Sequence, residues 1–248
     1  MPKRDHESDE EYKARKKAKK ALKKKKKNKK SHKPLVQQAV TAAAREEEEE
    51  TSSNGKETII TKEPYIEYKS FSDAPFAQPI HTALLNAGFT EPSPVQARAW
   101  PVALAGQDLI AVAKTGSGKT LGFLLPIFHK ITSNETTSTK TSIPSPKCLI
   151  LSPTRELAIQ IHGECIKFGS PLQVTAACIY GGTNVQAQVK ELKRVMPQII
   201  ICTPGRLCDL LERKTVLSVS DCCFCVLDEV CYLAFVILLP YVLRVAEI

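Results

Sequence analysis

The feature that most constrains the fold is an alternation of short apolar runs with longer helix-like segments. The apolar runs are Leu109–Val112, Cys148–Leu151, Val174–Ile179, Gln198–Cys202 and Cys223–Leu227, and the helix-like segments cover residues 119–131, 155–168, 185–195 and 205–213. This alternation predicts an α/β domain with a mostly parallel sheet. In such sheets ligands bind beyond the carboxyl ends of the strands, so the residues that follow each apolar run are the first candidates for a site.

A glycine-containing loop follows the first of these runs. Its residues are Ala113, Lys114, Thr115, Gly116, Ser117, Gly118, Lys119 and Thr120. Glycines let backbone N–H groups turn inward around a polyphosphate, and the start of the next helix adds its positive end. We expect Lys119 to contact the β- and γ-phosphates and Thr120 to bind Mg²⁺. The general phosphate-loop pattern has Gly at the position of Ala113. A chance glycine turn is nevertheless disfavoured, because an apolar strand-like run precedes the loop and a helix-like run follows it.

Charge divides the chain into two parts. Residues 1–33 hold 16 Lys and Arg against 5 Asp and Glu, a net charge of +11, and the remainder holds 19 against 21, a net charge of −2. The Lys-rich segment has almost nothing apolar to bury, so we expect a disordered tail that serves nuclear import or grips nucleic acid. A merely solubilising tail is the alternative. An acidic block, Glu46–Glu50, begins a linker to about residue 60.

Nine cysteines and no apolar N-terminal run predict a reducing compartment and no secretory signal. Cys222, Cys223 and Cys225 stand close together, but no second CxxC pair and no His follow at ligand spacing. We therefore expect buried reduced thiols in preference to zinc ligands or disulfides.

Three segments share one pattern of helix initiation: Ser93-Pro94-Val95-Gln96, Ser152-Pro153-Thr154-Arg155 and Thr203-Pro204-Gly205-Arg206. A hydroxyl side chain at the N-cap with Pro at the first helical position is a strong helix start. Each start places a long polar side chain beside free N–H groups, which suits a phosphate. Plain capping explains each segment equally well when it is taken alone.

Taken together, these segments resemble the DEAD-box RNA helicases. Gly88–Gln96 is similar to the Q motif of that family, with Phe71 at the place of its isolated aromatic residue. Further matches, in the family's order, are Ala113–Thr120 (motif I), Pro153–Ala158 (motif Ia), Gly181-Gly182 (the glycine pair), Thr203–Arg206 (motif Ib) and Val226–Glu229 (the first half of motif II). The resemblance runs from about Phe71 to Glu229. It implies a RecA-like fold and an ATP-dependent RNA helicase, with ATP and Mg²⁺ as cofactors.

The resemblance also implies a role for each matched residue. Gln96 would read the adenine edge, because an amide both donates and accepts, and Phe71 would stack on the base. Lys119 is catalytic together with Asp228, which would hold Mg²⁺, and Glu229, which would position and deprotonate the attacking water. The residues expected to contact RNA backbone, independently of its sequence, are Pro153, Thr154, Arg155, Gly181, Gly182, Thr203, Pro204, Gly205 and Arg206.

After Glu229 the chain departs from the family. The family continues Ala-Asp, whereas this chain reads Val230-Cys231-Tyr232, and the Ser-Ala-Thr motif and the second RecA-like domain are not found. The Ser-Ala-Thr strand of the family lies between the motif I and motif II strands, so either the sheet has a gap there or those two strands shift together. Ala234–Leu239 could fill the place, but an ending without an evolved role is favoured. The uncharged stretch Val230–Leu243 is too short to span a membrane.

We therefore expect three parts: a basic tail and linker (1–60), an incomplete RecA-like ATP-binding domain (61–229) and an apolar end (230–248). Such a chain is expected to be a monomer that binds ATP and RNA, and not a membrane. A catalytically inactive ATP- and RNA-binding fragment, or a chain without function, is the alternative. The Lys-rich tail resembles those of nucleolar ribosome-biogenesis helicases, which implies a nuclear, nucleolar location and pre-ribosomal partners.

Overall fold

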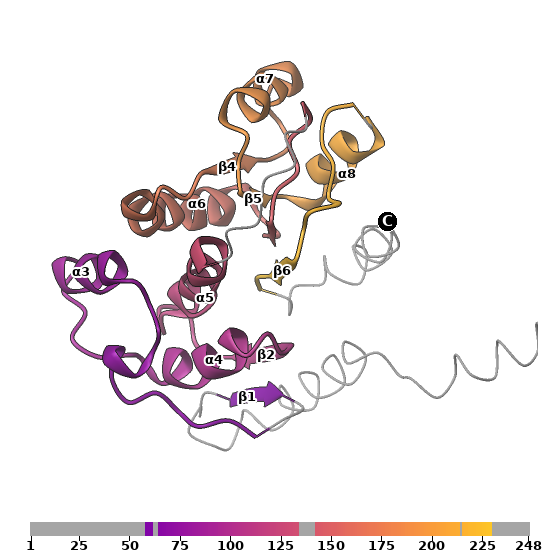
Figure 1. Ribbon diagram of the computed structural model, residues 1–248. Helices are drawn as coiled ribbons and strands as arrows, with labels where there is room; N and C mark the ends of the chain where they lie inside the picture. The colour runs from indigo at the N-terminus through magenta and orange to yellow at the C-terminus, as the bar shows by residue number, and fades with distance from the viewer. Residues whose placement is uncertain (1–57, 62–63, 134–141, 214, 230–248) are drawn as a thin grey trace, which may run out of the picture. The chain divides into compact units, whose positions relative to one another are not determined.

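The computed structural model describes residues 58–61, 64–133, 142–213 and 215–229, all of which belong to one unit within Gly55–Ile248 (Figure 1). The Lys-rich tail, the acidic block and the apolar end after Glu229 lie outside the described residues, and so do the expectations that concern them. The linker was expected to reach about residue 60, but Thr58–Thr61 form a strand that pairs within the domain. In the described part of the chain, no helix is long and apolar enough to cross a membrane.

The described elements follow the predicted α/β alternation. In chain order they are β1 (Thr58–Thr61), η1 (Phe71–Asp73), α3 (Gln78–Asn86), α4 (Pro94–Leu104), β2 (Leu109–Val112), α5 (Lys119–Ser133), β3 (Cys148–Leu151), α6 (Arg155–Gly169), η2 (Ser170–Leu172), β4 (Ala176–Ile179), α7 (Val185–Val195), β5 (Ile199–Cys202), α8 (Pro204–Glu212) and β6 (Phe224–Leu227). The α/β fold with a parallel sheet is thereby confirmed. β2 and β3 begin and end at the predicted residues, whereas β1, η1 and α3 were not predicted.

Four parallel strands form the main sheet in the order β4-β5-β3-β6. Leu151 at the end of β3 is in register with Cys202 of β5 on one side and with Leu227 of β6 on the other. Because the strands run in the same direction, the segments that follow them leave the sheet at one common edge.

The motif I strand is not part of that sheet. β2 pairs antiparallel with β1, with Thr58 opposite Val112, and among the described residues β2 makes no pair with β6. The sequence left two arrangements open: a gap between the motif I strand (β2) and the motif II strand (β6), or a shift of these strands towards each other. The described structure has the gap.

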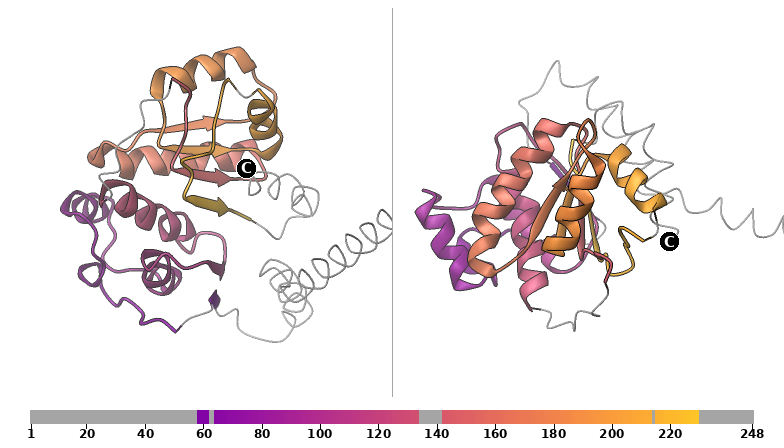
Figure 2. Two further views of the ribbon diagram at one scale, coloured as in Figure 1. Left: turned by 45° about the vertical axis from the view of Figure 1, so that its right-hand side comes forward. Right: turned by 90° about the horizontal axis from the view of Figure 1, so that it is seen from above.

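Two hydrophobic clusters cover the two faces of the main sheet. On one face, α3, α4, α5 and α6 pack with side chains such as Trp100, Phe128 and Ile161 against β3 and β5. On the other face, α7 and α8 pack through Leu192 and Leu210. Figure 2 shows these layers on either side of the strands. The alternating side chains of β3 and β5 divide between the clusters, which accounts for strands that are apolar at every position.

Two of the expectations for local structure need correction. Helix α6 begins at Arg155 with Thr154 as its N-cap, because the Thr154 hydroxyl accepts a hydrogen bond from Leu157 N. Ser152 is therefore not the cap, and Pro153 lies before the helix.

The cysteines near β6 are also less buried than expected. Cys222 is half-buried, while Cys223 and Cys225 are exposed, because β6 is the edge strand of the described sheet and its outer side has no neighbouring strand there. The eight described cysteines are free thiols.

The core packing predicts a large difference between two leucines. Leu124 on α5 is fully buried and Leu85 on α3 is 63% exposed. We expect Leu124→Ala to lower the free energy of unfolding by about 2–5 kcal/mol, because it removes buried contacts and leaves a cavity. The same substitution at Leu85 should change it by less than about 0.5 kcal/mol. Urea unfolding followed by circular dichroism measures both, and equal losses would contradict this core assignment.

Candidate functional site

The loop between β2 and α5 is held in a compact form by its own lysine. Lys119 Nζ donates to Ala113 O at 2.7 Å, which joins the first residue of α5 to the residue that follows β2. Gly118 has a φ of +91°, and a Cβ at this position would lie 2.5 Å from Gln96 Nε2. Only glycine fits both the backbone angle and this close approach. The loop therefore has the backbone freedom that a phosphate cradle needs.

Gln96 connects this loop to the start of α4. Its side chain is only 2% exposed. Gln96 Nε2 donates to Gly118 O at 3.0 Å, and Gln96 Oε1 accepts from Ser93 N at 3.1 Å. Both the oxygen and the nitrogen of the amide thus bond within the protein. Gln96 also completes the capping box with Ser93 at the start of α4, which the sequence had offered as the alternative role. The amide keeps one further N–H and one further lone pair with which to read an adenine, so base recognition and loop position would share one side chain.

Phe71 packs beneath this region. Its ring is 8% exposed and lies 6.0 Å from the ring of Trp100, at an interplanar angle of 42°. Trp100 in turn donates from Nε1 to Leu121 O at 3.2 Å, which joins α4 to α5 just after the loop. Stacking of Phe71 on a base stays a prediction. In this structure the ring contributes to the core that supports α4.

Asp228 and Glu229 follow β6 at the common edge of the sheet. Asp228 N donates to Leu151 O at 3.0 Å, so the parallel pairing with β3 continues to this residue. Burial raises the pKa of the Asp228 carboxyl above its ordinary value, while the nearby charge of Lys119 acts in the opposite direction. Glu229 is exposed, with a φ of 53°. The structure therefore brings Lys119 within electrostatic reach of Asp228, across the gap between β2 and β6.

The donor set at this place suits Mg²⁺. The Thr120 hydroxyl and the Asp228 carboxylate are oxygen ligands, and Mg²⁺ commonly binds one or two protein oxygens together with substrate phosphates. A half-buried carboxylate with a raised pKa also gains from a neighbouring cation. Among the described residues, no group of three or more His, Cys, Asp or Glu side chains could hold a metal by itself.

A second group of predicted residues lies after β3 and β4. Thr154, Arg155, Gly181 and Gly182 are all exposed. The Arg155 guanidinium lies over the ring of Tyr180, 5.3 Å from the centroid. A Cβ on Gly182 would lie 3.8 Å from Arg155 Nη1, so this cation is next to the glycine pair. An exposed arginine beside an exposed glycine turn is well suited to contact a phosphate backbone.

The start of α8 adds residues that face inward. Thr203 Oγ1 accepts from Gly181 N at 3.3 Å, and Gly205 is exposed. Arg206 is 5% exposed, and its guanidinium donates to Gln188 Oε1 and to Thr183 O. Pro204 is buried as well. Direct contact of Pro204 and Arg206 with RNA stays a prediction. In this structure Arg206 holds the neighbouring turn.

Two residues of this region were missed by the sequence reasoning: Gln188 on α7 and Tyr180 after β4. Gln188 is half-buried among Val185, Val189 and Leu192, with the i, i+3, i+4 and i+7 spacing of one helix face. A polar residue on an otherwise apolar face is the signal that could have identified it. Tyr180 carried no comparable signal.

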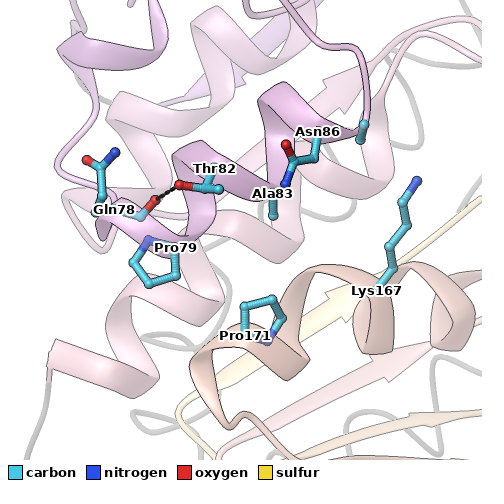
Figure 3. Close-up of a pocket in the computed structure, with 8 residues that line it drawn as sticks. Gln78, Pro79, Thr82, Ala83, Asn86, Lys167 and Pro171 are labelled. Carbon is cyan, nitrogen blue, oxygen red and sulfur yellow. Dashed lines mark hydrogen bonds between the residues drawn. The ribbon is translucent and has the colours of Figure 1, made fainter.

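A hollow is lined by residues that belong to neither group. It has a volume of about 590 Å³ and lies between α3 and the end of α6, where Pro79 and Ala83 face Pro171 and Lys167 (Figure 3). Its only charged lining residue is Lys167. The glycine loop, Gln96 and Asp228 are not among its lining residues, and we place the candidate site at the sheet edge instead.

The fold and the loop define a nucleotide-binding α/β domain of the P-loop class. A family model described as DEAD/DEAH box helicase matches residues 93–234, and the chain belongs to this family. The chain is 44% identical over 160 residues to the ATP-dependent RNA helicase-like protein DB10 of Nicotiana sylvestris, covering 64% of this chain and 25% of that protein. It is 46% identical over 144 residues to DEAD-box ATP-dependent RNA helicase 46 of Arabidopsis thaliana, covering 58% and 21%.

A solved structure agrees with these sequence relatives. The RNA helicase Prp28 from Chaetomium thermophilum bound to ADP superposes with a TM-score of 0.63 at 36% identity, covering 77% of this chain and 45% of that one. The chain thus spans about a quarter of the length of the curated relatives it matches.

The raised pKa of Asp228 predicts a pH-dependent gain on neutralising this residue. A carboxyl whose pKa is higher in the folded than in the unfolded state favours folding at low pH, and this contribution is lost as the pH rises through the folded pKa. We therefore expect Asp228→Asn to unfold at a higher urea concentration than the wild type near neutral pH, with the difference shrinking towards about pH 4.

The matched control is Asp221→Asn, which changes an exposed aspartate close to the same strand. Because this side chain is exposed, the substitution removes no buried charge and should change the urea midpoint little near neutral pH. A loss of stability in Asp228→Asn that is the same at every pH would contradict a desolvated carboxylate.

Proposed function

We propose that the chain binds ATP together with Mg²⁺ and holds the RNA backbone at the same sheet edge, in the service of ATP-dependent RNA unwinding. One observation carries this proposal: the loop with Lys119, the Gln96 amide and the Asp228 carboxylate assemble at the edge where Arg155 and Gly182 are exposed. Membership of the helicase family and the ADP in the similar solved structure support the choice of nucleotide.

Each residue near the loop has a proposed task. Lys119 would share or replace its bond to Ala113 O with one to the phosphates, and Gln96 would read adenine with its further N–H and lone pair. Thr120 and Asp228 would hold Mg²⁺, which supplies neutralisation of phosphate charge. Glu229, exposed beside them, would orient a water and accept its proton.

Location and partners are proposed from the tail and the family alone. The +11 net charge of residues 1–33 supports electrostatic attraction to RNA and import into the nucleus. We propose a nucleolar location, pre-ribosomal RNA particles as partners and a monomeric state. Imaging of a tagged chain with and without residues 1–33 tests the location.

Nucleotide binding should depend on two residues far apart in sequence. We expect saturable binding of fluorescent ADP with Mg²⁺, and a loss of about tenfold or more in affinity for Lys119→Ala, because a charge-assisted bond to phosphate is removed. Gln96→Ala should also weaken binding, because it removes both the adenine contact and the support of the loop. Fluorescence anisotropy titration measures both.

Lys190→Ala and Gln186→Ala, at exposed positions on α7, are the matched controls and should bind like the wild type. Glu229→Gln should bind nucleotide but abolish any RNA-stimulated hydrolysis that the wild type shows. Binding without hydrolysis in the wild type would support the alternative of a purely binding module. No saturable binding at all would rule out both readings.

RNA binding should be electrostatic and partly dependent on Arg155. Affinity for a single-stranded oligonucleotide is expected to fall steeply with salt, because cations of the protein replace counterions of the phosphates. Arg155→Ala should weaken binding and reduce the slope of log affinity against log salt by about one. Filter binding over a salt series measures this slope. An unchanged affinity and slope in Arg155→Ala would show that RNA does not use this edge.

A further inference from the structure

The turn between β4 and α7, residues Tyr180 to Thr183, is held by a side chain that lies five residues beyond it. Gln188 Nε2 donates to Tyr180 O at 3.2 Å and to Thr183 Oγ1 at 2.9 Å. Thr183 Oγ1 itself donates to Tyr180 O at 3.2 Å. The two ends of the turn are therefore joined through one amide group on α7.

The same turn is held from α8. Arg206 Nη2 donates to Thr183 O at 3.1 Å, and Arg206 Nη1 donates to Gln188 Oε1. Gly181 N donates to Thr203 Oγ1 at 3.3 Å. Asp209 lies 3.8 Å from Arg206 Nε, and its side chain is 61% exposed. Gln188 thus connects the turn with a buried guanidinium, and its oxygen and nitrogen serve different partners.

Gly182 is the exception in this network. It is exposed, with a φ of +79°, and among the described residues no hydrogen bond reaches its N–H or its C=O. Its neighbours Gly181 and Thr183 are both engaged. One free backbone donor therefore stands on a turn that is fixed on both sides, with the Arg155 side chain close by.

We propose that Gln188 is a positioning residue for RNA binding: it fixes the Tyr180–Thr183 turn so that Gly182 and Arg155 are presented together to one phosphate group. Gln188 acts through the turn and does not itself contact RNA. This inference rests on the proposed function of the sheet edge. Its physical basis is that a preorganised turn loses less conformational freedom on binding than a loose one.

Replacing Gln188 by leucine separates hydrogen bonding from packing. Leucine has a similar volume and suits the apolar face formed with Val185 and Leu192, but it can neither donate to the turn nor accept from Arg206. Gln188→Glu keeps the acceptor for Arg206 but loses both donations to the turn, so amide exchange in the turn should accelerate in this variant as well. Gln186→Leu is the matched control, because Gln186 is exposed on the same helix.

Two measurements on the full chain test the proposal. In the absence of RNA, amide hydrogen exchange in the turn should accelerate roughly fivefold to tenfold in Gln188→Leu, since hydrogen bonds that close the turn are lost. Exchange in β3 should stay unchanged, which shows that the fold is intact. Affinity for an oligouridylate probe should fall about threefold to tenfold with an unchanged salt slope, because no charge is removed.

The outcomes are distinct. A looser turn with weaker RNA binding in Gln188→Leu, a looser turn in Gln188→Glu and neither change in Gln186→Leu support the proposal. Exchange in the turn no faster than in Gln186→Leu overturns it, and so does a looser turn that binds RNA as well as the wild type. If Arg155→Ala leaves RNA affinity unchanged, the proposed RNA site fails, while the exchange data still decide whether Gln188 holds the turn.

Discussion

The parallel pairing of β3 with β5 and β6 is the constraint on which both groups of site residues depend. Leu151, Cys202 and Leu227 lie in register, so the chain leaves all three strands at one level. The chain continues from β3 to the start of α6, from β5 to the start of α8, and from β6 to Asp228. The pairing extends to the backbone of Asp228, which donates to Leu151 O at 3.0 Å. A shift of one residue in β6 would turn the carboxylate to the other face of the sheet.

Much of this arrangement could be predicted from the sequence, because the strands are short, apolar and bounded by turn residues. β2 and β3 matched their predicted limits, and α7 did so at both ends. The unpredicted α3 is an amphipathic helix that begins at Gln78 and Pro79 and has no side-chain cap. Helix α6 begins at Arg155, as predicted, but its N-cap was wrongly assigned to Ser152. Thr154 competed with Ser152 as a cap, and its hydroxyl bond to Leu157 N decided the outcome.

The sequence could not determine how each polar side chain uses its hydrogen bonds. Gln96 has the chemistry to recognise adenine, yet in the folded chain its amide bonds to Gly118 O and Ser93 N. Arg206 has the charge to bind phosphate, yet it is 5% exposed and donates inward. Residue type sets the capacity of a group, whereas burial and neighbours set its use. The motif spacing therefore identified candidate residues but could not separate ligand contacts from supporting contacts.

The glycine loop before α5 and the Tyr180–Thr183 turn differ in how many existing hydrogen bonds a ligand would meet. At the glycine loop, Lys119 and Gln96 are bonded to the loop itself, so a nucleotide would have to share or replace contacts such as the 2.7 Å bond from Lys119 Nζ to Ala113 O. At the glycine turn, the supporting bonds reach Gly181 and Thr183, and Gly182 is left open. A phosphate can approach Gly182 without breaking any of these bonds. Binding at the turn should therefore require less rearrangement than binding at the loop, and the loop is where a ligand can change the structure most.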